Sequence, residues 1–492
     1  MRNRARRGAL AVRLYEALAT ALRARPDGRI TTTRAARTYR DVLIDSTAKA
    51  VLLDRIAPRG ARVLLAMPNH LGYVSSLLAV LSRGDVPVLA DPSLTTAEID
   101  TLITGCGIDA VIAADDTGGV QIDNRSWARV TGAEGPRPVL APDTELCRLT
   151  SGSTRSPACI EFRAEAVLAA ATTWAEASEL TPDDRSLCFA GLYNGLAFNT
   201  TLIPNLLTGA QVILATGLPS AGSILRQITS TEPTILVAFP EAYNRVTEYP
   251  AESISAPTRA ALAAIRLRLS SAAPLSARTA ARMVALSGPV SDYYGIAETG
   301  PITFHRTPTA GGSHGRLLPG VSVTSRPRAD GIPVLQVRTR SMGTKYLNYP
   351  GEFERSVASD GSYVTSDTGT VIEGQVTLSG RAHPTLEIGG RKFSVDSVRD
   401  PILSFDGVAD CHVVQITTPS GRPCVAAAVE TTGVVDMTRL RTHLRAAIAA
   451  HKVPEVLLGV DALPRGATGK VKSAAVRELL LRTFRQSRDG GQ

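Results

Sequence analysis

Short apolar runs alternate with amphipathic segments through roughly the first 270 residues of the chain. The apolar runs have the length of buried strands, and the segments between them have apolar positions at helical spacing. The predicted strands are 61–67, 86–91, 107–114, 211–217, 234–239 and 266–271, and the predicted helices include 39–56, 72–84 and 96–104. This alternation predicts an α/β fold in which helices cover the faces of the sheets.

The pattern changes near residue 315, where four β-rich segments follow one another at 320–327, 332–340, 363–372 and 375–381. A small α+β tail then has predicted strands at 411–417 and 424–430 and predicted helices at 436–450 and 473–484. A chain of 492 residues is too long for a single hydrophobic core. We therefore expect a large N-terminal domain, 1–380, made of stacked sheets and helices with a β-rich subdomain, and a small mobile C-terminal domain, 381–492.

The apolar run near the N-terminus, 10–25, is interrupted by Arg13, Glu16 and Arg23. This pattern is typical of an amphipathic helix and not of a secretion signal. No stretch of eighteen uninterrupted apolar residues occurs, so we expect no membrane partner. The six cysteines show neither a CxxC pair nor the spacing of a metal site. Reduced, buried thiols in a cytoplasmic protein are the expectation.

The formal net charge of +9 raises the question of nucleic-acid binding. Beyond a basic run at the very start the arginines are scattered, and aromatic residues make up only 4% of the chain. Stacking platforms for bases are therefore missing. Anionic small substrates such as ATP or CoA account for the charge equally well, so we expect no nucleic-acid partner.

Four segments carry candidate chemistry. The loop 150–157 is rich in hydroxyls and glycine and can wrap phosphate oxygens. The segment 292–300 (DYYGIAETG) has a flat ring for a purine, an acceptor for its amine and a carboxylate suited to Mg²⁺. Asp367 and Arg381 can hold ribose hydroxyls, and the loop 463–472 (LPRGATGKVK) presents Lys470. Each segment alone is a weak signal, because such residues also favour ordinary turns.

The order and spacing of these segments resemble the adenylate-forming superfamily of acyl-CoA synthetases, nonribosomal peptide adenylation domains and firefly luciferases. LTSGSTRSP resembles its phosphate loop TSGSTGxPKG, SSAAPLS its GGAPLS stretch and YYGIAETG its YGxTE motif. YVTSDTG, GRAHPTLEIGGRKFSVDSV and LPRGATGK are similar to three further motifs of the superfamily, in the same order. The resemblance extends from about residue 37 to about residue 478.

In such enzymes the oxygen of a carboxylate attacks the α-phosphorus of ATP, which gives an acyl-AMP and pyrophosphate. The resemblance implies catalytic roles for Glu298 and Lys470, with Mg²⁺ held by Glu298 and Thr154. It implies that His383 stands at the hinge, at the start of the C-terminal domain. The implied cofactor-binding residues are Thr150, Ser151, Gly152, Ser153, Thr154, Arg155, Ser271, Ala272, Ala273, Pro274, Asp292, Tyr293, Tyr294, Gly295, Ala297, Asp367 and Arg381.

The resemblance also places an acid-binding pocket along 191–198 and 295–302. Its expected lining is Tyr193, Asn194, Gly195, Phe239, Ser270, Ile296, Gly300 and Ile302. Small and apolar walls suit an aromatic or medium aliphatic acid. No Asp occurs early in this stretch to bind an ammonium group, which disfavours an α-amino acid. Asn194 either orients a polar group of the substrate or caps a turn.

The chain departs from the family motifs at several positions. Ala158 stands where the phosphate loop has a Lys, and Arg155 and Cys159 replace glycines. Ala297 replaces the Thr of YGxTE, and Lys392 replaces an Arg. We hypothesise that Arg155 supplies the charge that Ala158 lacks, since its planar fork can take two phosphate oxygens. Retention of Glu298, Asp367, Arg381 and Lys470 favours a working adenylation site.

The sequence therefore predicts an ATP-dependent ligase that activates a carboxylic acid and transfers the acyl group to CoA, another thiol or an amine. One alternative is a diazotase that activates nitrite for an arylamine, and another is a non-catalytic nucleotide-binding relative. The cofactors expected are ATP and Mg²⁺, with CoA as a possible third. The fold alone does not choose among these functions.

Overall fold

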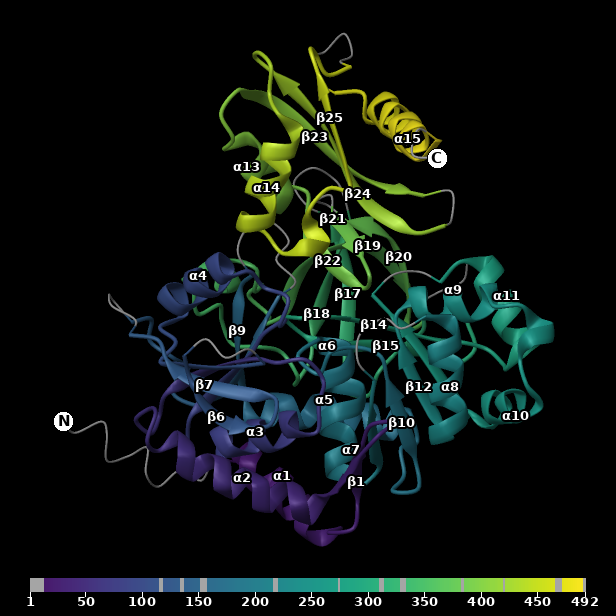
Figure 1. Cartoon of the computed structure of the whole chain (residues 1–492). Coiled ribbons are helices and arrows are strands. Elements are labelled where there is room, and N and C mark those ends of the chain that lie inside the picture. Colours follow the sequence, from purple (N-terminus) through teal and green to yellow (C-terminus); the bar gives the residue numbers. More distant parts are fainter. Residues whose placement is uncertain are drawn as a thin grey trace. The chain divides into compact units, whose positions relative to one another are not determined.

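A computed structural model describes residues 13–114, 118–132, 137–150, 157–215, 220–272, 275–308, 314–327, 333–381, 385–418, 421–464 and 471–489 (Figure 1). The chain divides into two compact units. The first comprises Met1–Pro92, Ile103–Thr150 and Ala158–Ala382, and the second Ser93–Leu102, Ser151–Pro157 and His383–Gln492.

One sheet of the first unit has the strand order β6-β7-β5-β3-β4-β8-β9 in the described ranges. Its strands are β3 (Arg62–Ala66), β4 (Val86–Leu89), β5 (Ala110–Ala113), β6 (Val120–Asp123), β7 (Ser126–Val130), β8 (Thr144–Leu149) and β9 (Cys159–Arg163). The central pairs β5–β3, β3–β4 and β4–β8 are parallel. The mostly apolar sequences of β3, β4 and β5 fit strands that are buried on both faces.

The second sheet of this unit has the order β17-β18-β19-β20-β16-β15-β14-β13-β12-β10-β11-β1-β2. Its first strands are β1 (Arg29–Thr31), β2 (Ala36–Thr38), β10 (Arg185–Cys188), β11 (Gln211–Leu214), β12 (Ile235–Ala238), β13 (Leu267–Ser271) and β14 (Ser291–Ile296). The antiparallel remainder is β15 (Gly300–His305), β16 (Arg316–Leu317), β17 (Ser322–Pro327), β18 (Pro333–Arg338), β19 (Tyr363–Ile372) and β20 (Gln375–Arg381). The change from parallel to antiparallel pairing falls at β14.

Helices cover both faces of the parallel part of this second sheet (Figure 1). Alternate residues of β12 divide between two hydrophobic clusters: Ile235 and Val237 face one, and Leu236 and Ala238 face the other. The helices before residue 382 are α1 (Arg13–Ala24), α2 (Tyr39–Leu53), α3 (Gly72–Ser82), α4 (Thr96–Cys106), α5 (Ala164–Ala177), α6 (Gly195–Ala197), α7 (Ile203–Thr208), α8 (Ala221–Thr231), α9 (Pro240–Glu248), η2 (Ala251–Ser253), α10 (Ala256–Ala264), α11 (Ala277–Leu286) and α12 (Glu352–Arg355).

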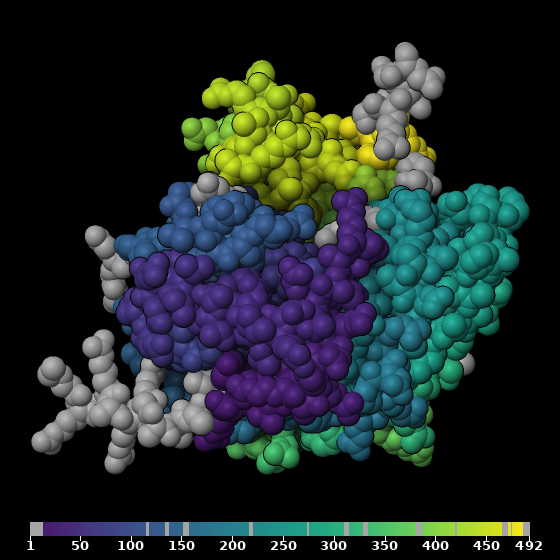
Figure 2. All heavy atoms as spheres, turned by 60° about the horizontal axis from the view of Figure 1, so that its bottom comes forward, coloured from purple at the N-terminus to yellow at the C-terminus, as the bar shows by residue number. Residues whose placement is uncertain are grey.

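The amphipathic segment predicted at the N-terminus forms α1, which buries Leu14, Leu18 and Leu22. These leucines join the same cluster as Ile203 and Leu206 of α7. In the space-filling view the purple N-terminal region lies beside teal parts of the chain (Figure 2). The parallel pairing of β1 with β11 continues this contact in the sheet.

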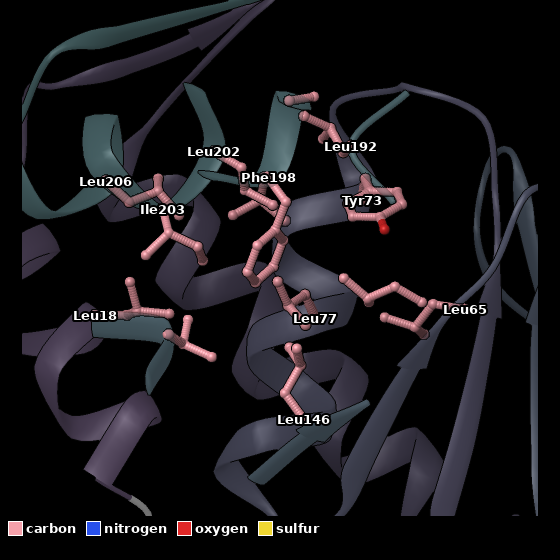
Figure 3. Packing of buried hydrophobic residues seen from close by; sticks show 14 of the residues in the cluster. Leu18, Leu65, Tyr73, Leu77, Leu146, Leu192, Phe198, Leu202, Ile203 and Leu206 are labelled. Atoms are coloured by element: carbon pink, nitrogen blue, oxygen red, sulfur yellow. The ribbon is translucent and has the colours of Figure 1, made fainter. Parts of the chain in front are cut away.

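A π-helix, η1 (Phe198–Leu202), stands between α6 and α7. Its first residue, Phe198, is buried and points toward Leu77 of α3 in the largest core cluster (Figure 3). Single π turns inside α-helices are rare and are frequent at functional sites. The stretch 191–198, which is predicted to line the acid pocket, ends at this turn.

The second unit contains the pair β21 (Thr385–Ile388) and β22 (Arg391–Ser394) and a sheet of β23 (Val408–Thr417), β24 (Pro423–Thr431) and β25 (Val456–Val460). Its helices are α13 (Asp396–Leu403), α14 (Met437–Ala447), η3 (Ala450–Lys452) and α15 (Ser473–Asp489). Gly389 and Gly390 both have positive φ and form the tight turn between β21 and β22. Two clusters of apolar residues between Leu386 and Phe484 form its core.

The expected fold class is confirmed: large sheets covered by helices precede a smaller α+β unit. Every strand predicted above is present, most with shifted ends, and the predicted segments 363–372 and 375–381 have the same ends as β19 and β20. The elements that were not predicted include the π-helix and the pair β21–β22. Within the described ranges, no helix combines the length and the hydropathy that crossing a membrane requires.

Candidate active site

A tight hairpin carries Glu298. Strands β14 and β15 pair antiparallel with Ile296 opposite Gly300, so that residues 297–299 form the turn at the tip. Gly300 has a φ of 74°, which favours glycine. A Cβ on Gly295 would lie 2.6 Å from the carbonyl oxygen of Gly300, so this position also requires glycine. Backbone geometry therefore explains both glycines of the DYYGIAETG motif.

The carboxylate of Glu298 is positioned by two tyrosines. The hydroxyl of Tyr346 donates to Oε1 of Glu298 at 2.9 Å, and it lies 2.8 Å from the hydroxyl of Tyr363. Burial, together with the negative charge of Glu298, raises the pKa of Tyr346 far above its ordinary value. Tyr346 therefore stays protonated and donates to Glu298. A carboxylate held in one orientation in this way is suited to binding a cation.

Asp367 lies where the pairing of β19 with β18 shifts register, between Val364 and Thr368, and it is 4% exposed. It accepts a hydrogen bond of 2.8 Å from the hydroxyl of Tyr294 to its Oδ2, and Arg381 is its direct partner in the register of β19 and β20. The structure thus brings together three of the predicted nucleotide-binding positions. The ring of Tyr294 packs in a cluster with Ile302, which is fully buried.

Residues that are predicted to bind the nucleotide lie at the end of β13 and in the adjacent strand β14. Ser271 ends this strand and pairs with Tyr293, and Asp292 pairs with Ser270. Ala272 has a φ of 79°, a left-handed conformation that costs a residue with a Cβ about 1–2 kcal/mol. Tyr293 points to the core, where its ring meets the ring of Trp174 edge-on at 5.5 Å. Ala273 and Pro274 lie outside the described residues.

The predicted phosphate loop is the connection between the antiparallel strands β8 and β9. Two hydrogen bonds close its base: Thr150 donates its amide to Ala158 at 2.8 Å, and the Thr150 hydroxyl accepts from the Ala158 amide at 3.0 Å. Ser151, Gly152, Ser153, Thr154 and Arg155 lie outside the described residues, as do His383 and Lys470.

Asn194 caps the short helix α6, because its side chain accepts a hydrogen bond of 2.9 Å from the amide of Leu196. This is the capping role that the sequence left open. Phe239 is buried in the largest cluster, and Ser270 is buried with no partner for its hydroxyl in the described part of the chain. Tyr193, Gly195 and Ile296 are half-buried.

Sequence reasoning missed two side chains near these positions. Tyr346 is separated from Glu298 by 48 residues, and only the fold brings them together. Arg148 is a charged residue inside the buried strand TELCRL, and its Nη2 donates to the carbonyl oxygen of Ala297 at 3.3 Å. A cation in a buried strand two residues before the phosphate loop was the signal that could have drawn attention to it.

Two open depressions of about 660 Å³ and about 460 Å³ lie on the first unit. Both are lined by Glu165, Thr339 and Arg340. Pro301, from the stretch 295–302 predicted to line the acid pocket, lines the smaller depression, and none of the individually predicted site residues lines either depression.

The fold and the order of these motifs define an adenylate-forming ligase. The profile of the family described as "AMP-binding enzyme" matches residues 18–326, which is more than half of the chain. The chain belongs to this family and is an AMP-forming ligase.

Three relatives illustrate the similarity. The chain is 23% identical to acyl-CoA synthetase FUM10 of Gibberella moniliformis, over 85% of the chain and 88% of that protein. It is 26% identical to 3-hydroxybenzoate–CoA ligase of an Aromatoleum species, over 88% of the chain and 82% of that protein. The solved structure of a double mutant of o-succinylbenzoate CoA synthetase from Bacillus subtilis superposes with a TM-score of 0.80 at 19% identity, covering 94% of this chain and 98% of that one. This last likeness shows the fold alone.

Proposed function

We propose that this ligase activates an aromatic or medium aliphatic carboxylic acid as its acyl-AMP and then passes the acyl group to the thiol of CoA. The observation that carries the proposal is the Glu298–Tyr346–Tyr363 arrangement, because it holds one carboxylate in a fixed orientation at the end of the hairpin. The similarity to a 3-hydroxybenzoate–CoA ligase supports both the aromatic acid and the acceptor.

In the first step an oxygen of the acid's carboxylate forms a bond to the α-phosphorus of ATP. The bond from that phosphorus to the bridging oxygen breaks, and pyrophosphate leaves with the electron pair. Both reactants are anions, so donors and cations at the site must offset the charge that they bring together. We assign this role to Lys470 and to the hydroxyls of the loop 150–157. Asp367 and Arg381 are proposed to hold the ribose, and Asp292 the adenine amine.

Mg²⁺ is the proposed metal, and its ligands are Glu298 and a hydroxyl of the loop, Thr154. The described residues contain no group of three or more His, Cys, Asp or Glu that could enclose a metal. Mg²⁺ commonly binds one or two carboxylates together with substrate phosphates, so a single oriented carboxylate fits this ion. When bound, the ion offsets negative charge on the phosphates.

In the second step the sulfur of CoA attacks the acyl carbon, the thiol proton is lost and AMP leaves. The turn of Gly389 and Gly390 supports this acceptor, because a turn without side chains allows a pantetheine chain to approach the backbone closely. An amine that replaces the thiol would give an amide by the same exchange.

The decisive experiment measures AMP and pyrophosphate release from ATP with Mg²⁺ and pooled aryl and aliphatic acids, with and without CoA or amines. We expect release that requires an acid and rises with CoA. Lys470→Ala should lower it by roughly 10²–10³-fold, since removing one electrostatic stabiliser typically has this effect. Lys472→Ala, in which an exposed lysine of the same segment is removed, is the matched control. Absence of AMP with every acid, or equal rates for Lys470→Ala and the control, would overturn the proposal.

A further inference from the structure

Arg148 of β8 is buried to an unusual degree for an arginine, with 4% of its surface exposed. The carbon of its guanidinium lies 4.7 Å from the ring centre of Phe162 and 5.1 Å from that of Phe198. Aromatic faces attract a cation, but they do not neutralise its charge. The guanidinium is therefore a cation in mostly apolar surroundings.

The hydrogen-bonding capacity of this guanidinium is largely unused. Its Nη2 has the long contact with the carbonyl oxygen of Ala297, whereas Nε and Nη1 have no partner in the described part of the chain. Burial lowers the pKa of Arg148 to about 10, although Tyr293 and the negative charge of Glu298 act in the opposite direction, so the group remains charged at neutral pH. Buried donors without hydrogen-bond partners are costly, and a ligand that supplies acceptors and a further negative charge offsets this cost.

Arg83 is also 4% exposed, and it shows how this chain accommodates a buried arginine with a structural role. Its Nε lies 2.6 Å from Asp85 and its Nη1 2.8 Å from Asp54, and its Nη2 donates to the carbonyl oxygen of Ala57 at 2.6 Å. Every nitrogen of that guanidinium is matched. Arg148 differs because no such carboxylate forms an ion pair with it among the described residues.

The position of Arg148 relates it to the acid pocket. A Cβ on Gly195 would lie 3.3 Å from Nη1, so the glycine lies close against the guanidinium and a larger residue there would crowd it. Gly195 and Phe198 belong to the stretch predicted to line the pocket, and Ala297 precedes Glu298. Arg148 lies two residues before Thr150 on the same face of an extended strand, which separates the two side chains by roughly 6.5 Å. This distance is comparable to the length of a short spacer or one aromatic ring.

We propose that Arg148 binds a second carboxylate of the acid substrate, so that the substrate class is dicarboxylic acids with an aromatic or short aliphatic spacer. The reacting carboxylate lies on the side of Thr150, and the second carboxylate accepts from Nε and Nη1 of the guanidinium. A carboxylate matches this planar fork with two parallel hydrogen bonds, and it supplies the negative charge that a neutral hydroxyl lacks. The inference rests on the proposed function, because it concerns the acid that the site activates.

The test measures binding to the full-length protein by calorimetry, with and without a non-cleavable ATP analogue. The probes are the three benzenedicarboxylates and straight-chain dicarboxylates, each paired with its monomethyl ester. We expect the wild type to bind at least one diacid roughly 30-fold or more tightly than its monoester. Arg148→Met should abolish that preference and leave the affinity for the monoester unchanged.

Gly195→Ala is a second variant that keeps the charge but places a Cβ against Nη1, and it should weaken diacid binding more than monoester binding. Equal affinities for every diacid and its monoester in the wild type would overturn the inference. An unchanged preference in Arg148→Met would overturn it as well. Because binding is measured without turnover, a diacid preference without AMP formation would refute the proposed function and leave the arginine subsite standing.

Discussion

At the scale of single residues, the candidate site depends on side chains that orient other side chains. Tyr346 touches Glu298 directly, and Tyr363 touches only the hydroxyl of Tyr346. Burial raises the pKa of both tyrosines, so both hydroxyls stay protonated. We consider Tyr346 a positioning residue, because it acts on the proposed metal ligand and not on the reacting atoms.

Tyr346→Phe should therefore lower kcat by roughly 10–100-fold and raise the Mg²⁺ concentration needed for half-maximal activity, the usual effect of removing a partner of a metal ligand. Steady-state kinetics over a Mg²⁺ titration measure both quantities. Tyr363→Phe, which keeps the bond to Glu298, serves as the control and should change them less. If Tyr346→Phe lowers the melting temperature but leaves the Mg²⁺ dependence intact, Tyr346 has only a structural role.

At the scale of elements, the start of α3 depends on a neutral histidine. His70 is buried; its Nδ1 accepts a hydrogen bond of 3.1 Å from the amide of Gly72, and its Nε2 lies 3.3 Å from the hydroxyl of Ser126. Burial is the main reason that its pKa falls to about 4, and the positive charge of Lys49 acts in the same direction. The folded chain therefore resists protonation of His70.

This shift predicts a pH dependence of stability. An unfolded histidine binds its proton near pH 6.5, so between about pH 6.5 and about pH 4 the unfolded state holds more protons and the free energy of unfolding falls as the pH falls. The contribution of neutral His70 to the free energy of unfolding is fully present above pH 6.5. Below pH 4 this free energy is lower by about 3 kcal/mol. His70→Gln should flatten this part of the curve, which urea unfolding at several pH values measures. An unchanged slope would assign the acid sensitivity to other groups.

At the scale of the whole molecule, the hydrophobic clusters of the two units consist of different residues in the described part of the chain. The clusters of the second unit draw on residues between Leu386 and Phe484, and the clusters described for the first unit contain none of these. Separate cores are the physical basis for separate cooperative unfolding.

Calorimetry of the full chain should accordingly resolve two transitions. Leu444→Ala truncates a fully buried side chain of the second unit, so it should lower the temperature of only one transition and reduce the unfolding free energy of that unit by about 2–5 kcal/mol. Leu77→Ala truncates a fully buried side chain of the first unit and should lower the temperature of only the other transition. A single transition that both substitutions lower equally would show that the units unfold together.

Strong periodicity explains what the sequence could predict. The runs that became β3, β12 and β19 and the amphipathic stretch that became α1 carry their pattern within a few residues, so their type was readable without the fold. The π-helix FNTTL has no such pattern, and Glu298 with Tyr346 is a contact between distant segments. The role of Asn194 was ambiguous because the same amide serves a cap or a ligand, and the structure shows the cap.

The π turn of η1 affects how the predicted wall of the acid pocket can change through insertions and deletions in evolution. A π turn accommodates one residue more than an α turn, so it marks the place where the helix has one residue to spare. Deleting one residue there restores a regular helix and rotates the residues before the turn by about 100° relative to those of α7. A change of chain length by one residue would thus turn the side chains of 194–198 to new directions without substituting any of them.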